Sequence, residues 1–344
     1  MPTIVVTGAA GGVGRRAVAS LAGAGHTVVA IDVARVPDAP AGVEVHVADL
    51  VTADLKQVLE GADVVVHLAF AYGPDLDDDE LAVANVEVTR RLLDAAGDAG
   101  VRHAVLVSSA TVYGAWPDNP VPLTEDAPVR PNPGFTYAVH KAECERLCHE
   151  WREGHPGTTV TVLRPAVAIG EDESWLARSL SAAAGIRTPG DEPPSQFVHV
   201  DDLAEAVCLA ARERLDGVYN VAADGWIDDE TLRSLAGAPP RLPVPERLVT
   251  RAAALTWRLR VGPTPPGIIP YTRHPWVVAN GRLRAAGWAP RHSNEEAFVA
   301  AHPGTWWSRV SPRRRQELAL GVTTAGLVGL VTGAVALLRR RGRR

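Results

Sequence analysis

The chain has 344 residues, of which 46% are hydrophobic, 22% charged and 5% aromatic, a composition that excludes a disordered or fibrous protein. Its three cysteines, with no CxxC pair, exclude a disulfide framework and a zinc cage. The net charge of −5 is uneven: residues 309–344 hold nine Arg and one Glu, which leaves −13 on the first 308 residues. An acidic body argues against nucleic acid as a partner, and a basic tail favours an anionic membrane surface.

Short β-branched runs alternate with helix-patterned stretches from the N-terminus onward. The predicted strands are 3–7, 27–31, 43–47, 64–67, 104–108 and 159–163. The predicted helices are 14–22, 55–59, 81–99 and 137–153. Continuous apolar strands separated by helices are typical of a parallel sheet covered on both faces. Residues 1–165 are therefore predicted to form an α/β domain with a Rossmann-type, doubly wound parallel sheet.

The pattern loosens after residue 165, where Pro and Gly become frequent. Three further elements are expected to return to the sheet: strand 197–200, helix 201–212 and strand 218–221. Residues 197–221 then belong with the first domain, and the rest of 166–305 is expected to form mainly a smaller substrate-binding region. Residues 306–317 are interpreted as a linker.

A glycine-rich turn, Thr7-Gly8-Ala9-Ala10-Gly11-Gly12-Val13-Gly14, joins the first predicted strand to the first helix. Glycines let a backbone approach a pyrophosphate, and the free N–H groups of the helix start bind the anion. A glycine-rich turn alone is weak evidence for a cofactor site, and a plain tight turn is the alternative. The residues expected to form the phosphate cradle are Gly8, Gly11, Gly12, Val13 and Gly14.

Asp32 closes the second predicted strand, 18 residues after Gly14. An acid at that point accepts hydrogen bonds from the ribose hydroxyls of a dinucleotide, and its charge repels a 2′-phosphate. The sequence therefore predicts NAD as the cofactor in preference to NADP. Two alternatives stay open: Arg35 could pair with a 2′-phosphate, and Asp32 could simply cap the following turn.

Tyr137 and Lys141 stand four residues apart, on one face of a predicted helix. A neighbouring cation favours a phenolate and lowers the pKa of the phenol, which can then act as a general acid or base. The chain has two lysines against 33 arginines, so a chance Tyr-x-x-x-Lys match is a poor explanation. A surface pair without a role is the alternative.

With these motifs in place, the chain from Thr3 to about Trp288 resembles the extended short-chain dehydrogenase/reductase superfamily, in particular its NAD-dependent epimerase/dehydratase family. The motifs that carry the resemblance are Thr7-Gly8-x-x-Gly11-x-x-Gly14, Asp49-Leu50, His67-Leu68-Ala69, Asn85-Val86, Ser108-Ser109, Tyr137-x-x-x-Lys141, Leu163-Arg164-Pro165, Phe197-Val198-His199-Val200-Asp201-Asp202 and Gly287-Trp288.

The resemblance implies a catalytic set and further cofactor contacts. Ser109 is expected to hold the substrate oxygen, Tyr137 to act as the acid/base, and Lys141 to bind the nicotinamide ribose and lower the pKa of the tyrosine. Asn85 is expected to support the site and His199 to be structural. Further cofactor contacts are implied for Asp49 and Leu50, which flank the adenine, and for Leu68, Ala69, Tyr137 and Lys141. Family members commonly dimerise through the helix that carries the tyrosine, so the resemblance also implies a homodimer.

Three positions depart from the pattern of family members that act on sugar nucleotides. Val167 stands where those members have Asn, Ser195 where they have a diphosphate-binding Arg, and Ala279 where they have Asp. We therefore expect an NAD(P)-dependent oxidoreductase that acts on a small-molecule secondary alcohol or ketone. A nucleotide-sugar epimerase or dehydratase that recycles its NAD is the alternative, and a non-catalytic cofactor-binding protein is a third.

Residues 318–338 contain no charged side chain and are flanked on both sides by arginines. The segment is long enough to span a bilayer. We expect a transmembrane helix that tethers the protein to a membrane, with the catalytic domain in the cytoplasm. A buried C-terminal helix is one alternative. A helix lying in the membrane interface is another, because arginines on both flanks leave no clear preference for which end faces the cytoplasm.

Overall fold

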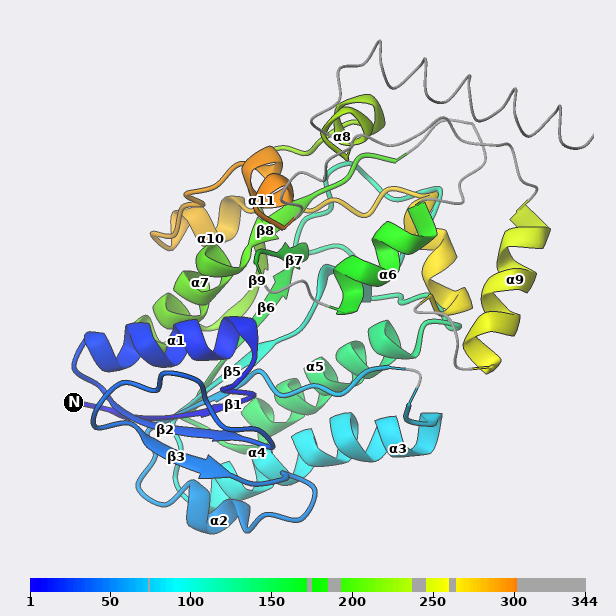
Figure 1. Ribbon diagram of the computed structural model, residues 1–344. Coiled ribbons are helices and arrows are strands. Elements are labelled where there is room, and N and C mark those ends of the chain that lie inside the picture. The colour runs from blue at the N-terminus through cyan, green and yellow to red at the C-terminus, as the bar shows by residue number, and fades with distance from the viewer. Residues whose placement is uncertain (74, 172–174, 185–192, 237–245, 260–263, 302–344) are drawn as a thin grey trace, which may run out of the picture.

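A seven-stranded parallel sheet forms the centre of the protein in the computed structural model, which describes residues 1–301 except 74, 172–174, 185–192, 237–245 and 260–263 (Figure 1). The strand order is β3-β2-β1-β4-β5-β6-β9, an order of the doubly wound type of parallel sheet that the sequence predicts. The strands are β1 (Thr3–Thr7), β2 (Thr27–Asp32), β3 (Glu44–Val47), β4 (Val64–His67), β5 (His103–Val107), β6 (Thr159–Pro165) and β9 (Gly217–Val221).

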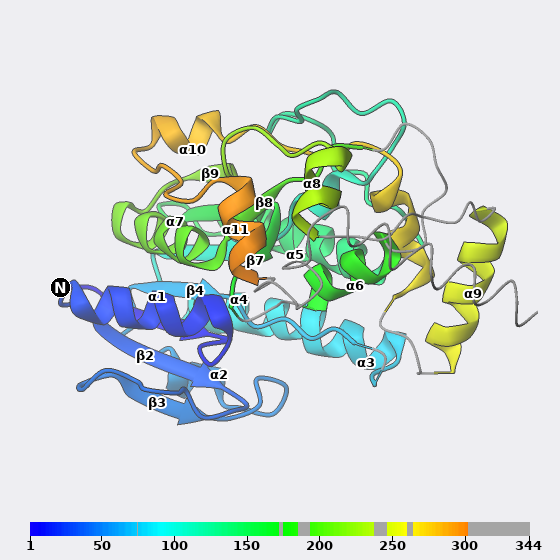
Figure 2. The same cartoon turned by 45° about the horizontal axis from the view of Figure 1, so that its top comes forward.

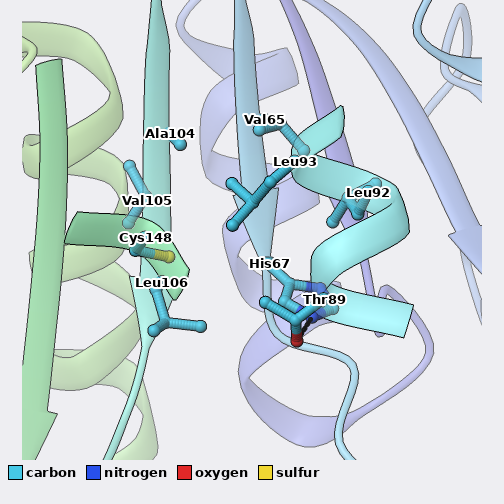
Figure 3. Close-up of a pocket in the computed structure, with 9 residues that line it drawn as sticks. All are labelled: Val65, His67, Thr89, Leu92, Leu93, Ala104, Val105, Leu106 and Cys148. Carbon is cyan, nitrogen blue, oxygen red and sulfur yellow. Dashed lines mark hydrogen bonds between the residues drawn. The ribbon is translucent and has the colours of Figure 1, made fainter. Parts of the chain in front are cut away.

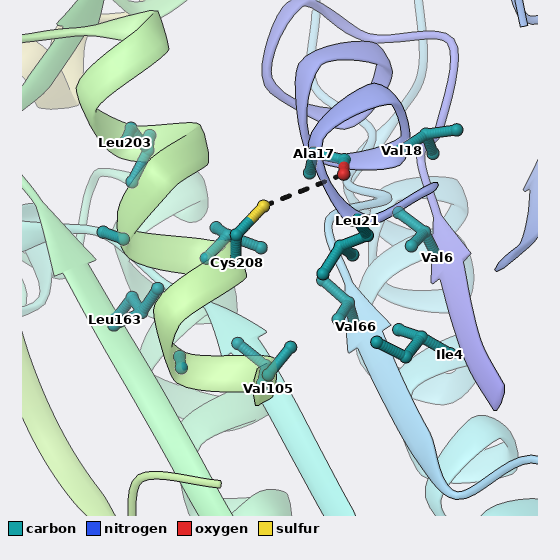
Figure 4. Packing of buried hydrophobic residues seen from close by; sticks show 14 of the residues in the cluster. Ile4, Val6, Ala17, Val18, Leu21, Val66, Val105, Leu163, Leu203 and Cys208 are labelled. Atoms are coloured by element: carbon teal, nitrogen blue, oxygen red, sulfur yellow. Dashed lines mark hydrogen bonds between the residues drawn. The ribbon is translucent and has the colours of Figure 1, made fainter. Parts of the chain in front are cut away.

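Helices cover both faces of the sheet (Figures 1 and 2). One face carries α1 (Gly12–Gly23) and α7 (Val200–Glu213), and the other carries α2 (Leu55–Val58), α4 (Val88–Asp98) and α5 (Thr136–Gly154). Because side chains alternate along a strand, β1 points Ile4 and Val6 toward the first layer and Val5 toward the second. Figure 4 shows the first layer, where the Cys208 thiol of α7 points at the Ala17 carbonyl of α1.

The strand expected at 197–200 does not return to this sheet. Instead β8 (Phe197–His199) pairs with β7 (Val167–Ile169) in a separate two-stranded sheet. α7 begins at Val200 directly after β8, so β9, which follows α7, takes the edge position beside β6. The predicted helix 81–99 also divides, into α3 (Asp78–Ala82), the π-helical turn η1 (Val83–Glu87) and α4.

Most of the remaining elements pack over the carboxyl edge of the sheet in a third hydrophobic cluster. They are η2 (Ala110–Tyr113), α6 (Trp175–Ala184), α8 (Asp229–Ala236), α9 (Glu246–Arg258), η3 (Pro266–Thr272) and α11 (Asn294–Ala301). α10 (Gly281–Ala285) instead packs Leu283 into the same cluster as α1 and α7. η3 meets the start of α5 without room for a side chain: a Cβ on Gly267 would lie 1.8 Å from the Gly134 carbonyl oxygen.

The expected linker 306–317 and transmembrane helix 318–338 lie outside the described residues. Among the helices of residues 1–301 that the structure describes, none has the length and apolar character needed to cross a bilayer.

A buried ion pair joins α5 to β6. The Arg164 guanidinium donates to the Glu145 carboxylate at 2.6 to 3.1 Å, and the two side chains are 5% and 9% exposed. The Ser108 hydroxyl, just past the end of β5, donates to the same carboxylate. The guanidinium also lies 4.7 Å from the centre of the Tyr113 ring. The Glu145 carboxylate of α5 therefore joins three segments: α5, β6 and the end of β5.

Replacing Glu145 with Gln should lower the free energy of unfolding by about 3 kcal/mol or more, because it leaves the buried Arg164 charge without its counter-ion. Urea unfolding followed by circular dichroism measures the change. Glu143→Gln is the matched control, since Glu143 pairs with Arg146 at the surface, where the two side chains are 35% and 47% exposed, and such pairs contribute less than about 1 kcal/mol. Equal losses in the two variants would contradict the prediction.

Candidate active site

Most of the residues predicted to form the site lie at one edge of the sheet. The glycine-rich turn follows β1, Asp32 ends β2, and Ser109 lies just past β5. Asp49 and Leu50 follow β3, and Leu68 and Ala69 follow β4. Because the strands are parallel, their carboxyl ends meet at one edge, where open α/β sheets bind their ligands. The structure thus brings together what the sequence places far apart.

The glycine-rich turn is packed so closely that side chains cannot replace two of its glycines, Gly8 and Gly14. Gly8 has a φ of 68°, and a Cβ there would lie 2.6 Å from the Ala69 backbone nitrogen. A Cβ on Gly14 would lie 2.1 Å from the Gly8 carbonyl oxygen. α1 starts directly behind the turn, and no side chain caps its first N–H groups in the described structure. A backbone cradle with open N–H groups fits a pyrophosphate.

The two carboxylates at this edge are fixed by backbone N–H groups. Asp32 accepts from the Ala10 nitrogen of the glycine-rich turn and from the Ala34 nitrogen, each at 3.0 Å. It therefore ties the turn to β2 and also caps the next turn, as the alternative interpretation held. Each of its oxygens keeps a lone pair for a ribose hydroxyl. Asp49 is exposed and accepts from the Val51 nitrogen at 2.9 Å, and Leu50 beside it is buried.

His67, at the end of β4, joins the glycine-rich turn to α4. Its Nδ1 lies 2.7 Å from the Thr7 hydroxyl and its Nε2 lies 3.0 Å from the Thr89 hydroxyl (Figure 3). The Thr89 hydroxyl donates to the Asn85 carbonyl at 2.6 Å, so it accepts from Nε2–H, and Nδ1 accepts from Thr7. Burial, with a contribution from the charge of Lys141, lowers the pKa of His67 to about 3. The ring is therefore a neutral structural link at physiological pH.

The same network fixes the loop after β4. The Ala69 nitrogen donates to the Thr7 hydroxyl at 3.3 Å. The Asn85 amide accepts from the Ala71 nitrogen at 2.7 Å and donates to the Ala71 carbonyl at 2.8 Å. Asn85 thus supports the site, as expected. The cavity of about 10 Å³ beside His67 and Thr89 is lined mainly by apolar core side chains (Figure 3). It has room for about one water molecule and none for a substrate.

Lys141 is buried on α5 with its ammonium turned toward the end of β5. Nζ donates to the Val107 carbonyl at 2.8 Å and lies 3.8 Å from the centre of the Phe70 ring. The distance from Nζ to the centre of the Tyr137 ring is 6.0 Å. Burial lowers the pKa of Lys141 to about 8.

The pKa of the Tyr137 phenol is raised, whereas the sequence predicts that it is lowered. Burial raises its pKa to about 12, and a hydrogen bond with Ser109 acts in the opposite direction. The Ser109 oxygen accepts from the Thr111 nitrogen at 3.2 Å and from the Thr111 hydroxyl at 2.9 Å, so its own proton is available to donate. In the protein alone, loss of solvent outweighs the effect of the Ser109 hydrogen bond on the pKa of the phenol.

Sequence reasoning missed a set of rings around Tyr137, which we call the aromatic cluster. Its members are Phe70, Tyr72, Phe135, Tyr137, Trp175 and Trp257. The Tyr137 ring centre lies 5.2 Å from that of Phe70 and 5.5 Å from that of Tyr72. The rings come from segments widely separated in the chain, and no spacing in the sequence pairs them.

His199 lies with Asp201 and His292, which together could hold a metal ion. Their atoms already have partners. His199 Nδ1 accepts from the Asp201 nitrogen at 3.2 Å, His292 Nδ1 lies 3.1 Å from Asp202, and the two imidazoles stack at 4.0 Å. This arrangement caps the start of α7 and agrees with a structural role for His199.

The chain is similar in sequence to a known protein family and to several characterised proteins. Residues 4–222 match the NAD dependent epimerase/dehydratase family. A dTDP-glucose 4,6-dehydratase of Streptomyces griseus is 33% identical over 256 residues, 67% of this chain and 76% of the relative. The 4-hydroxy-2-methyl-3-oxo-4-farnesyl-3,4-dihydroquinoline-1-oxide ketoreductase of Stigmatella aurantiaca is 30% identical over 233 residues, 64% of this chain and 67% of the relative.

The solved structure of MoeE5 in complex with UDP-glucuronic acid and NAD is 25% identical, with a TM-score of 0.69 over 89% of this chain and 99% of that one. The chain spans between about half and three quarters of the length of the curated relatives that it matches.

Lys141 should contribute stability that rises between about pH 8 and pH 9.5 in the protein without cofactor. The folded chain releases the Lys141 proton near its pKa of about 8, whereas the unfolded chain keeps it to about 10.5. For this group the unfolded state holds more protons, so its contribution to the free energy of unfolding rises by about 1–2 kcal/mol over the interval. Burial raises the pKa values of the Cys144, Cys148 and Cys208 thiols, which contribute in the opposite direction, so the lysine is measured by difference.

Urea unfolding at several pH values measures how the free energy of unfolding changes over this interval. In Lys141→Met the change should be less positive than in the unaltered chain by about 1–2 kcal/mol, while in Lys56→Met it should equal that of the unaltered chain, since Lys56 is 72% exposed at the surface. Equal changes in Lys141→Met and the unaltered chain would contradict the prediction.

Proposed function

The chain belongs to the NAD-dependent epimerase/dehydratase family, and from this premise we propose that it is an oxidoreductase that moves a hydride between NAD and a secondary alcohol or ketone. The observation that carries the proposal is the meeting of Ser109, Tyr137 and Lys141 beside the glycine-rich turn. A protein that only bound the cofactor would have no use for a phenol and a serine hydroxyl joined by a hydrogen bond.

NAD is the cofactor of the family, and when bound its nicotinamide ring accepts or returns the hydride. The glycine-rich turn from Gly8 to Gly14 would hold the pyrophosphate with backbone N–H groups, and Asp32 would hold the adenosine ribose. Asp49 and Leu50 would flank the adenine, with Leu68 and Ala69 along the chain of the cofactor. Lys141 would bind the nicotinamide ribose. The charge of Asp32 opposes a 2′-phosphate, which favours NAD over NADP.

In the reaction, Ser109 donates its free proton to the substrate oxygen and orients it. Tyr137 then transfers the proton: the phenol gives it to a ketone oxygen, or the phenolate takes it from an alcohol. With a pKa raised to about 12 by burial, the phenol is protonated at neutral pH, which suits ketone reduction. Before a substrate takes this hydrogen bond, the single Ser109 proton favours the phenolate; the positive charge of Lys141 favours it with substrate bound as well.

A nucleotide-sugar epimerase or dehydratase is the second candidate. The dehydratase of Streptomyces griseus and the sugar-nucleotide complex of MoeE5 favour it. The residues of this chain favour the first candidate, because Ser195 stands where a diphosphate-binding guanidinium is expected, and Val167 and Ala279 lack the polar groups of those members. The ketoreductase of Stigmatella aurantiaca is a relative whose name describes net reduction.

The proposed function predicts net conversion of NAD to NADH, or the reverse, which absorbance at 340 nm records for a panel of secondary alcohols, ketones and UDP- and dTDP-sugars. Tyr137→Phe should reduce turnover by at least about 100-fold, the usual contribution of a general acid–base, and leave NADH affinity nearly unchanged. The control is Tyr219→Phe, because the Tyr219 hydroxyl donates to the Asp216 carbonyl away from the site. Turnover of a sugar nucleotide without net change in NADH would instead establish the epimerase.

We propose in addition that residues 318–338 tether the protein to a membrane, with the catalytic domain in the cytoplasm. The support is the uncharged sequence of the segment and its arginine flanks. The full-length chain should then sediment with membranes and resist alkaline carbonate, whereas a chain ending at Ser308 should stay in the supernatant and remain active. Release of the full-length chain by carbonate would favour a helix lying in the interface, and its recovery without detergent would refute the tether.

A further inference from the structure

We propose that the aromatic cluster binds an apolar, ring-bearing part of the substrate, so that the protein acts on apolar cyclic or aryl ketones and alcohols rather than on sugar nucleotides. This inference rests on the proposed function, since it names the substrate class of the same site.

The cluster surrounds the group that transfers the proton. The Tyr137 ring centre lies 5.5 Å from that of Phe135 and 6.2 Å from that of Trp175, in addition to its contacts with Phe70 and Tyr72. Trp175 lies 4.0 Å from Tyr72, and Trp257 extends the cluster at 6.1 Å from Tyr72. A substrate oxygen within reach of Tyr137 therefore brings the rest of the substrate against aromatic rings.

The rings are arranged on separate elements that converge at one end of the molecule. Phe70 and Tyr72 lie on the loop after β4, Trp175 begins α6, and Trp257 lies near the end of α9. Both views show α3, α6 and α9 gathered at this end (Figures 1 and 2). Phe135 is fully buried, whereas the other rings are half-buried and keep surface for a ligand.

One buried nitrogen in the aromatic cluster has no hydrogen-bond partner among the described residues. The indole nitrogen of Trp175 is buried and makes no hydrogen bond to any residue that the structure describes. An unpaired buried donor is unfavourable, and a single acceptor oxygen on a bound ligand would satisfy it. The cluster thus provides apolar faces and one N–H donor, the usual composition of a site for an apolar molecule with few polar groups.

The charges beside the cluster oppose a diphosphate. Asp78, at the start of α3, accepts from the Thr136 hydroxyl next to Tyr137, and its charge contributes to the raised pKa of Tyr72. Asp77, Asp79 and Glu80 lie on the same short, exposed segment. A sugar nucleotide would bring two phosphate charges toward these carboxylates, whereas an uncharged ketone meets no such repulsion.

The test compares 1-tetralone with cyclohexanone, ring ketones that differ by a fused benzene ring, and uses UDP as the nucleotide probe. Calorimetry on the full-length, NAD-loaded protein gives the dissociation constants, because the oxidised cofactor cannot reduce the ketones during the titration. Reduction is measured separately with NADH by absorbance. We expect 1-tetralone to bind at least about 10-fold more tightly than cyclohexanone and more tightly than UDP, because each aromatic contact contributes about 2- to 12-fold.

Trp257→Leu should reduce the preference for 1-tetralone over cyclohexanone by about threefold or more, since it keeps apolar volume and removes one ring. Trp226→Leu is the matched control: Trp226 is 44% exposed and lies outside the cluster. Thermal unfolding checks the fold of each variant, and Tyr72→Leu replaces Trp257→Leu if that variant does not fold.

Equal affinity for the two ketones, tighter binding of UDP, or an unchanged preference in Trp257→Leu would overturn the inference. Its failure and that of the proposed function are distinguishable. If both ketones are reduced without preference, the proposed function stands and the inference fails. If 1-tetralone binds selectively and NADH is never oxidised, the binding surface stands and the oxidoreductase proposal fails.

Discussion

The buried pair of Glu145 and Arg164 is the constraint on which the geometry of the candidate site depends. Tyr137, Lys141 and Glu145 follow one another at four-residue intervals, so one face of α5 carries the phenol, the ammonium and the anchoring carboxylate. Glu145 binds Ser108, whose neighbour Ser109 hydrogen-bonds the phenol. The pair therefore sets the distance between the serine and the tyrosine, and it does so away from solvent, where a lost partner cannot be replaced by water.

A second, uncharged network positions the cofactor side of the site. Thr7, His67 and Thr89 form a chain of hydrogen bonds from the glycine-rich turn to α4, and Asn85 extends it to the loop after β4. A neutral imidazole suits this place, because a charged one would face the buried Lys141 ammonium. The π-helical turn η1 carries Asn85 and lies within the helical stretch predicted over 81–99, between α3 and α4.

Local sequence was sufficient for the parallel sheet, the glycine-rich turn and the Tyr137–Lys141 pair, because each depends on neighbours in the chain. It was insufficient where the outcome depends on distant segments. Whether β8 or β9 lies beside β6 is decided by where α7 packs. The pKa of Tyr137 depends on burial among rings contributed by α6 and the loop after β4, and the position of the lysine along the helix carries no information on that burial.

The contact between Gly134 and Gly267 limits how this scaffold can diversify. η3 and the start of α5 touch backbone to backbone, one residue before Phe135 and directly ahead of Tyr137. A Cβ at residue 267 would meet the backbone of Gly134 and Phe135, directly ahead of the helix that bears the phenol, whereas a Cβ at residue 134 would make only an ordinary contact at 3.8 Å. New specificities acquired by exchanging the C-terminal region between relatives must therefore keep a glycine at residue 267, because any larger residue there would push on the segment that positions the proton donor.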